Sequence, residues 1–229
     1  MAFLSHCISG FFKRWKKEGL KSTVFLCYQQ VSWKLLDFHD RRLDKKICGR
    51  DLSRTVTSIY RQTMGATSSQ PTRYGALDIL FRDLTFSAED SLLDVGCAKG
   101  RVLAYLLHRK FPGKLTGIEL NRQVAAEAKA WTDRFPQITL LCGNVFDLNL
   151  NSFTVFYLFN PMMPDTLRRF LEKLEQELTH PATLIFLSRP DVPMDHPGWT
   201  LLRKGIIDKK WGMPLFNGRQ AYAIARYTP

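Results

Sequence analysis

Small residues recur in a short turn that directly follows an apolar run. The run ends at Asp94, and the turn contains Gly96, Ala98 and Gly100 before a second apolar stretch that predicts a helix. Because glycine has no Cβ, such a turn lets the backbone approach a ligand closely, and the N–H groups at the helix start point towards it. The chemistry that this pattern predicts is the binding of a nucleotide-like ligand.

The spacing of the small residues separates two classes of ligand. A dinucleotide fingerprint anchored on Gly96 needs glycine at positions 98 and 101, but the chain has Ala98 and Arg101. A nicotinamide-dependent oxidoreductase is therefore a disfavoured alternative. Asp94, Gly96 and Gly100 match the first motif of class I S-adenosylmethionine-dependent methyltransferases, which the segment resembles with Ala98 in place of the commoner glycine. The resemblance implies S-adenosylmethionine as cofactor.

Two further strand ends carry polar residues at positions that suit this cofactor. The predicted strand 114–119 ends in Glu119, and an acid at this place in a βαβ unit accepts hydrogen bonds from ribose hydroxyls. The predicted strand 138–142 leads to Asn144 and Val145. The resemblance implies that the Asn144 carbonyl and the Val145 N–H contact the adenine ring. A simple Gly-Asn turn is the alternative.

The loop that precedes the glycine turn carries a second resemblance. Gln70, Pro71, Thr72 and Tyr74 form the pattern Gln-Pro-Thr-x-Tyr just before a predicted helix, and proline is favoured at such a helix start. The pattern is similar to a group of small class I methyltransferases in which this loop folds over the cofactor. The resemblance implies that Gln70, Thr72 and Tyr74 contact its methionine end and that Tyr74 assists catalysis. An ordinary capped helix is the alternative.

The predicted fourth strand, residues 154–159, ends at Asn160 and Pro161. This pair resembles the start of the Asn/Asp-Pro-Pro-aromatic motif of amino-directed methyltransferases. It implies that Asn160 orients an amine acceptor, beside Pro161, and also contacts the cofactor. Met162 and Met163 replace the second proline and the aromatic residue, which disfavours a nucleic-acid base as acceptor. A protein lysine or a small amine is expected, with a lipid head group and nucleic acid as further alternatives.

The resemblance as a whole assigns one set of residues to each role. The expected catalytic residues are Asn160, Pro161 and Tyr74. The expected cofactor contacts are Gln70, Thr72, Tyr74, Asp94, Gly96, Cys97, Ala98, Gly100, Glu119, Leu120, Asn144, Val145 and Asn160. No metal is expected, because the five histidines and five cysteines are scattered and form no ligand motif.

The elements that must position these residues predict an α/β fold. It is a Rossmann-like class I methyltransferase fold with a seven-stranded, mostly parallel sheet. The last two strands, 199–207 and 220–227, form an antiparallel terminal hairpin. We expect a methyltransferase domain over residues 65–229 and a basic helical extension over residues 1–64.

The extension carries much of the positive charge. Residues 1–60 hold 12 Lys and Arg against five Asp and Glu, or +7 of the net +12. One helix is predicted over residues 20–38 and a second over 51–64. The helical segment is expected to pack on the domain or cover its cleft. Five apolar residues of the first helix share one face: Val24, Tyr28, Val31, Leu35 and Phe38. Contact of residues 1–60 with an anionic membrane or an acidic partner is the sharper alternative, and nucleic acid is less expected.

Cysteine usage and hydropathy bear on the compartment. The five cysteines are dispersed without a Cys-x-x-Cys pair, which is typical of reduced thiols. No apolar run is long enough to span a membrane, and the apolar N-terminus lacks the features of a secretory signal. A cytoplasmic protein is expected, with peripheral membrane attachment as an alternative. A non-catalytic basic binding module on the same fold also stays open.

Overall fold

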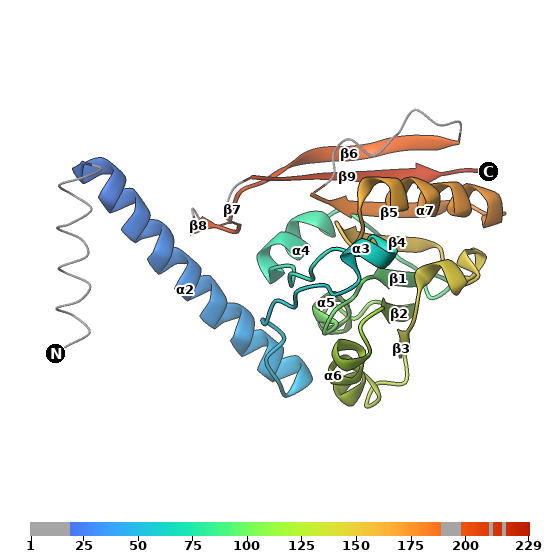
Figure 1. The fold of residues 1–229 in the computed structure, drawn as a ribbon, viewed down its shortest axis with the longest axis horizontal. Coiled ribbons are helices and arrows are strands. Elements are labelled where there is room, and N and C mark those ends of the chain that lie inside the picture. The colour runs from blue at the N-terminus through green and yellow to red at the C-terminus, as the bar shows by residue number, and fades with distance from the viewer. Residues whose placement is uncertain (1–18, 189–197, 211–212, 217–218) are drawn as a thin grey trace.

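The computed structural model describes residues 19–188, 198–210, 213–216 and 219–229. Its centre is a seven-stranded sheet in the order β3-β2-β1-β4-β5-β9-β6 (Figure 1). The strands are β1 (Ser91–Val95), β2 (Lys114–Glu119), β3 (Ile138–Cys142), β4 (Val155–Phe159), β5 (Ala182–Leu187), β6 (Trp199–Ile207) and β9 (Gln220–Tyr227). Strands β1 to β5 are parallel, and β9 is antiparallel to both β5 and β6. The predicted sheet and terminal hairpin are confirmed.

Helices cover both faces of this sheet. The described helices are α2 (Leu20–Cys48), α3 (Arg61–Met64), α4 (Tyr74–Leu80), α5 (Arg101–His108), α6 (Arg122–Thr132) and α7 (Pro164–Glu177), with 3-10 turns η1 (Val145–Asp147) and η2 (Leu150–Ser152). One apolar core lies between the sheet and α2, α4, α5 and α6, and the second lies under α7. Strand β1 therefore lies inside the sheet with both faces covered, as is typical of an interior parallel strand.

The switch in strand order occurs at β1. Strand β2 pairs on one side of β1 and β4 on the other, with Asp94 of β1 opposite Gly117 and Tyr157. Chain connections leave in opposite directions at this point, so a crevice forms beyond the carboxyl ends of β1 and β4. The glycine turn that follows β1 lies at this crevice.

Helix α2 is longer than the predicted helix 20–38. It runs for 29 residues and ends where Gly49 adopts a left-handed conformation with φ of 75° and its N–H bonds to Lys45 O. The predicted helix 51–64 is wrong over most of its length. Asp51 accepts the Ser53 N–H in a local turn, and only residues 61–64 are helical. Val56 instead forms a β-bridge with Ser69, as suits a β-branched residue.

The apolar face of α2 does not pack on the domain. Phe38 is 66% exposed and Val31 58%, and Val24, Tyr28 and Leu35 are exposed with them. The buried face carries Leu36, Asp40, Asp44 and Cys48, spaced by four residues. Two of these are aspartates paired with arginines, so hydrophobicity alone assigns the wrong face to the interior. The part of the extension formed by residues 1–18 lies outside the described residues.

The end of the chain returns to α2. A small hairpin of β7 (Lys209–Lys210) and β8 (Met213–Pro214) links β6 to β9, and β8 packs on α2. Leu215 and Phe216, which follow β8, are buried. Among the described residues no helix has the length and hydropathy needed to cross a bilayer.

Candidate cofactor and methyl-transfer site

A pocket of about 1140 Å³, measured with the space at its mouth, lies at the carboxyl ends of β1, β2 and β4. Its floor is the glycine turn after β1, and its walls come from the ends of β2 and β4 and the turn after β3. Residues 56–72 contribute much of the remaining wall. The pocket therefore lies in the crevice outside the carboxyl ends of the strands, where open α/β sheets bind their ligands.

The glycine turn is held in conformations that most residues avoid. Gly96 has φ of 71°, and a Cβ built on it would lie 3.0 Å from Pro161 Cβ. Its N–H and that of Cys97 both donate to Ile118 O at 3.0 Å. Ala98 is left-handed too, with φ of 49°. The turn therefore brings bare backbone against the segment that follows β4.

Glu119, at the tip of β2, fixes this turn from the other side. Its Oε2 accepts the Ala98 N–H at 2.9 Å and its Oε1 accepts the Asn121 N–H at 2.8 Å. Burial raises the pKa of Glu119, although these backbone donors favour the ionised carboxylate. Each oxygen keeps a lone pair for a further donor, such as a ribose hydroxyl.

Asp94 offers an acceptor that the described residues leave unused. It is 3% exposed and lines the pocket, and its Oδ2 has no hydrogen-bond partner among these residues. Burial, with the nearby charge of Glu119, raises the pKa of Asp94 well above its usual range. A buried acceptor of this kind costs free energy unless a ligand supplies a donor. A cofactor with an ammonium group and ribose hydroxyls therefore fits the two carboxyl groups and the glycine turn.

The turn after β3 completes the cofactor side. Asn144 and Val145 line the pocket, and Asn144 Oδ1 accepts the Phe146 N–H at 3.1 Å as it caps η1. Asn144 thus caps a local turn, as the alternative prediction stated, and it also lines the pocket.

The loop 70–74 is divided between two tasks. Gln70 and Thr72 line the pocket, and Thr72 Oγ1 lies 2.9 Å from the Tyr157 hydroxyl at the pocket wall. Tyr74 is outside the lining. Its hydroxyl donates to Asp44 Oδ1 at 2.9 Å, because Tyr74 starts α4 and faces α2. This placement differs from the expected contact with cofactor and acceptor.

The segment after β4 is hydrogen-bonded to Thr67, in the chain 52–69 that lines the pocket. Asn160 has φ of 43°, and its backbone O accepts the Thr67 hydroxyl, while the Thr67 N–H donates to Pro161 O at 3.0 Å. Pro161 lines the pocket, but Asn160 is not part of the lining. Of all the residues predicted to contact the cofactor, those outside the lining are Tyr74, Gly100 and Asn160.

Several lining residues were not predicted. Val56, Tyr60 and Met64 come from a segment expected to be helical and outside the domain, and Lys99 and Arg101 flank the predicted Gly100. The pattern of residues 52–64 gives no signal of this role, because it depends on the bridge between Val56 and Ser69. The predicted division at residues 64 and 65 passes through this wall of the pocket.

The strand order, with helices on both faces and an antiparallel hairpin at the end, is that of the class I methyltransferase fold. Comparison with known families agrees: residues 92–180 match a family model described as a methyltransferase domain. The chain therefore has a class I methyltransferase fold with a methyltransferase domain, and S-adenosylmethionine is its cofactor.

Solved structures share the fold at low sequence identity. A candidate methyltransferase from Escherichia coli, yhhF, has a TM-score of 0.53 at 16% identity, over 68% of this chain and 86% of its own. A candidate tRNA methyltransferase from Streptococcus pneumoniae has a TM-score of 0.50 at 15% identity, over 67% of this chain and 69% of its own. An RNA methyltransferase from Salinibacter ruber in complex with S-adenosyl-L-homocysteine has a TM-score of 0.49 at 18% identity, over 69% and 92%. No curated protein sequence matches the chain.

When bound, the cofactor supplies an electrophilic methyl group on a sulfonium. The chain then has to bind it, align a nucleophile behind that carbon and keep water out. The glycine turn, Asp94 and Glu119 suit the binding, and residues 56–69 contribute to the wall of the pocket. Among the described residues no group of side chains is arranged to hold a metal ion.

Proposed function

We propose that this protein transfers a methyl group from S-adenosylmethionine to an amine nitrogen, on a protein lysine or a small molecule. The supporting observation is that Pro161, just after β4, faces Gly96 in the glycine turn so closely that a Cβ built on Gly96 would lie 3.0 Å from the Pro161 Cβ. The Asn160-Pro161 segment thus adjoins the cofactor side of the pocket, where an acceptor has to enter.

The backbone of Asn160 supports a functional role for this residue. A left-handed conformation at a residue other than glycine stores strain, and such residues cluster at functional sites. Asparagine tolerates this conformation better than most residues. In the proposal, its side-chain carbonyl orients the acceptor, and Pro161 forms the adjacent wall.

A lysine acceptor has to lose its proton before it attacks. The carboxyl groups among the described lining residues are Asp94 and Glu119, both on the cofactor side, and the phenols are Tyr60 and Tyr157. Burial raises the pKa of Tyr157, so this phenol does not serve as a base near neutral pH. Desolvation of the amine in the closed pocket is therefore the proposed route to its neutral form.

A nitrogen in RNA is the second candidate acceptor. The net charge of +12 favours an anionic partner, and one of the structures that share the fold is a candidate tRNA methyltransferase. The excess of positive charge in residues 1–60 equally suits an acidic partner or an anionic membrane surface, and residues 1–18 of that region are outside the described structure.

The test is transfer of a labelled methyl group to separate pools of lysine-containing proteins, small amines and tRNA. We expect label in an amine pool. Asn160→Gly, which keeps the left-handed backbone, should reduce transfer at least tenfold with cofactor affinity retained, and Asn149→Ala at the cap of η2 is the control. Label in tRNA alone would select the second candidate. Cofactor binding without transfer to any pool would instead favour a binding module.

A further inference from the structure

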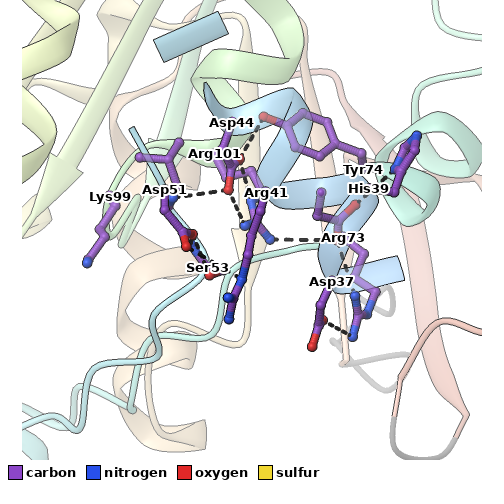
Figure 2. Close-up of polar contacts among 12 residues, drawn as sticks. Asp37, His39, Arg41, Asp44, Asp51, Ser53, Arg73, Tyr74, Lys99 and Arg101 are labelled. Atoms are coloured by element: carbon purple, nitrogen blue, oxygen red, sulfur yellow. Dashed lines mark hydrogen bonds and ion pairs between the residues drawn. The ribbon is translucent and has the colours of Figure 1, made fainter. Parts of the chain in front are cut away.

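A carboxylate of the N-terminal helix lies among the segments that form the cofactor pocket (Figure 2). Asp44, on α2, is fully buried. It accepts two hydrogen bonds from Arg101, Nε to Oδ1 at 3.0 Å and Nη2 to Oδ2 at 2.6 Å. It also accepts the Tyr74 hydroxyl at 2.9 Å and the Leu52 N–H at 3.0 Å. One side chain therefore ties three separate segments to α2.

Each of the three segments forms part of the pocket. Arg101 is the first residue of α5, directly after the glycine turn, and it lines the pocket. Leu52 lines the pocket at the start of the covering chain 52–69. Tyr74 follows Thr72, which lines the pocket, with one residue between them. Asp44 itself is outside the lining, so any effect on a ligand has to pass through these partners.

Two arginines face the buried carboxyl groups of this cluster, and a third, half-exposed carboxyl group lies at its edge. Arg101 is 4% exposed, and Asp40, one turn before Asp44 on α2, lies 3.9 Å from its Nη1. Arg73, in the loop that leads to Tyr74, pairs with Asp40 at 3.2 Å and with Asp37 at 2.7 Å. Burial acts to lower the pKa of Arg101, but the hydrogen bonds and charge of Asp44 raise it on balance. A guanidinium held in two-point contact has one orientation, whereas a single contact allows several.

We propose that Asp44 is a positioning residue for the cofactor site: its carboxylate fixes Arg101 and thereby the start of α5 and the glycine turn before it. Helix α2 then contributes to cofactor binding through these partners and is more than an appended segment. The proposal rests on the assignment of S-adenosylmethionine to this pocket. Ligand affinity separates it from a purely stabilising role, since a stabilising contact alters unfolding and leaves the affinity of folded protein unchanged.

The experiment compares the full-length protein with Asp44→Asn. The asparagine amide has the same shape as the carboxylate, but one of its oxygens is replaced by an NH₂ group. That NH₂ group is a donor and cannot accept the second hydrogen bond from Arg101, so the two-point contact is lost. The control is Asp83→Asn, which breaks the 2.7 Å ion pair of Asp83 with Arg203, outside the pocket lining. S-adenosylhomocysteine affinity is measured by calorimetry at a temperature where circular dichroism shows each protein fully folded.

We expect Asp44→Asn to weaken binding at least tenfold and Asp83→Asn to leave it unchanged. Asp44→Glu, which keeps the charge, should recover part of the loss. Wild-type affinity in folded Asp44→Asn would overturn the proposal, even if its melting temperature falls. Should Asp44→Asn fail to fold, Arg101→Lys decides, since it keeps the positive charge and removes the two-point contact with Asp44: weaker binding supports the proposal and unchanged binding refutes it. Failure of the wild-type protein to bind would contradict the cofactor assignment itself.

Discussion

Gly96 is a residue of the cofactor turn whose backbone is tightly constrained by its neighbours. Its φ of 71° is unfavourable for other residues, and Pro161 Cβ would lie 3.0 Å from any added Cβ. We expect Gly96→Ala to lower the free energy of unfolding by about 1–3 kcal/mol, from the strained backbone and the crowding. Urea unfolding of the ligand-free protein measures this loss.

Gly143→Ala provides the matched control. Gly143 also lines the pocket, but a Cβ built on it meets nothing within 4 Å. Its unfolding free energy should stay within about 0.5 kcal/mol of wild type. Equal losses in the two variants would contradict the proposed constraint at Gly96.

The raised pKa values of Asp94 and Glu119 predict that stability and cofactor binding depend on pH. Burial raises the pKa of Glu119, and burial with the charge of Glu119 raises that of Asp94 well above its usual range. A carboxyl group whose pKa is higher in the folded than in the unfolded protein stabilises the fold fully at pH values below its unfolded pKa. This stabilisation is lost as the pH rises through its pKa in the folded protein. A cationic cofactor favours both ionised forms, so its binding should release protons and strengthen as the pH rises through this window.

Calorimetry in two buffers with different ionisation enthalpies measures that proton release. Asp94→Asn should release fewer protons and show a flatter pH profile. Equal affinity from about pH 5 to about pH 8, with no proton release, would contradict the linkage.

Residue identities were predictable where a local pattern carries them. Asp94, Gly96 and Glu119 follow from strand ends and a turn within one βαβ unit. The link of Asp44 to Arg101 spans 57 positions and joins two helices. No local pattern encodes such a contact, which is why Tyr74 was expected in the pocket when its hydroxyl is bound to Asp44.

At the scale of elements, the covering segment 64–69 depends on its contact with the chain after β4. Thr67 bonds to that chain through both its hydroxyl and its N–H, and Ala66 bridges Met162. Thr67→Val keeps the shape and the N–H bond but removes the hydroxyl bond. We expect the free energy of local opening of residues 64–69 to fall by about 0.5–1.5 kcal/mol, which is measured as faster amide exchange over these residues.

Thr63→Val is the control for this element, because Thr63 is exposed on α3. It should leave exchange over residues 64–69 unchanged. The same rate of exchange in Thr67→Val and wild type would show that the hydroxyl bond does not hold the segment.

Elements with a clear periodicity were predicted well, and those set by distant contacts were not. Strands β6 and β9 have the predicted bounds, 199–207 and 220–227. The expected helix 51–64 failed because the backbone there pairs with Ser69 and bonds to Asp44. The inner face of α2 was missed because its aspartates are buried only together with arginines from other elements.

On the scale of the whole molecule, the chain that follows the hairpin of β7 and β8 reaches the pocket wall. Phe216 is 4% exposed and its ring lies edge-on to Phe159, with centroids 6.1 Å apart, and Phe159 lines the pocket. Phe216→Ala should cost about 3–5 kcal/mol of unfolding free energy, as for other large buried aromatic residues. Ile59→Ala, at a side chain 74% exposed, should change it by less than about 0.5 kcal/mol. A loss below about 1 kcal/mol for Phe216→Ala would show that the hairpin is only loosely attached.

The central claim is that this pocket binds S-adenosylmethionine through Glu119 and the glycine turn. Calorimetric titration of the full chain with S-adenosylmethionine, S-adenosylhomocysteine and NADH tests it most directly. We expect micromolar binding of the first two, none of NADH, and a loss of at least tenfold, about 1.4 kcal/mol, in Glu119→Ala. No binding of either adenosyl ligand by the folded chain, or undiminished binding by a folded Glu119→Ala variant, would contradict the account.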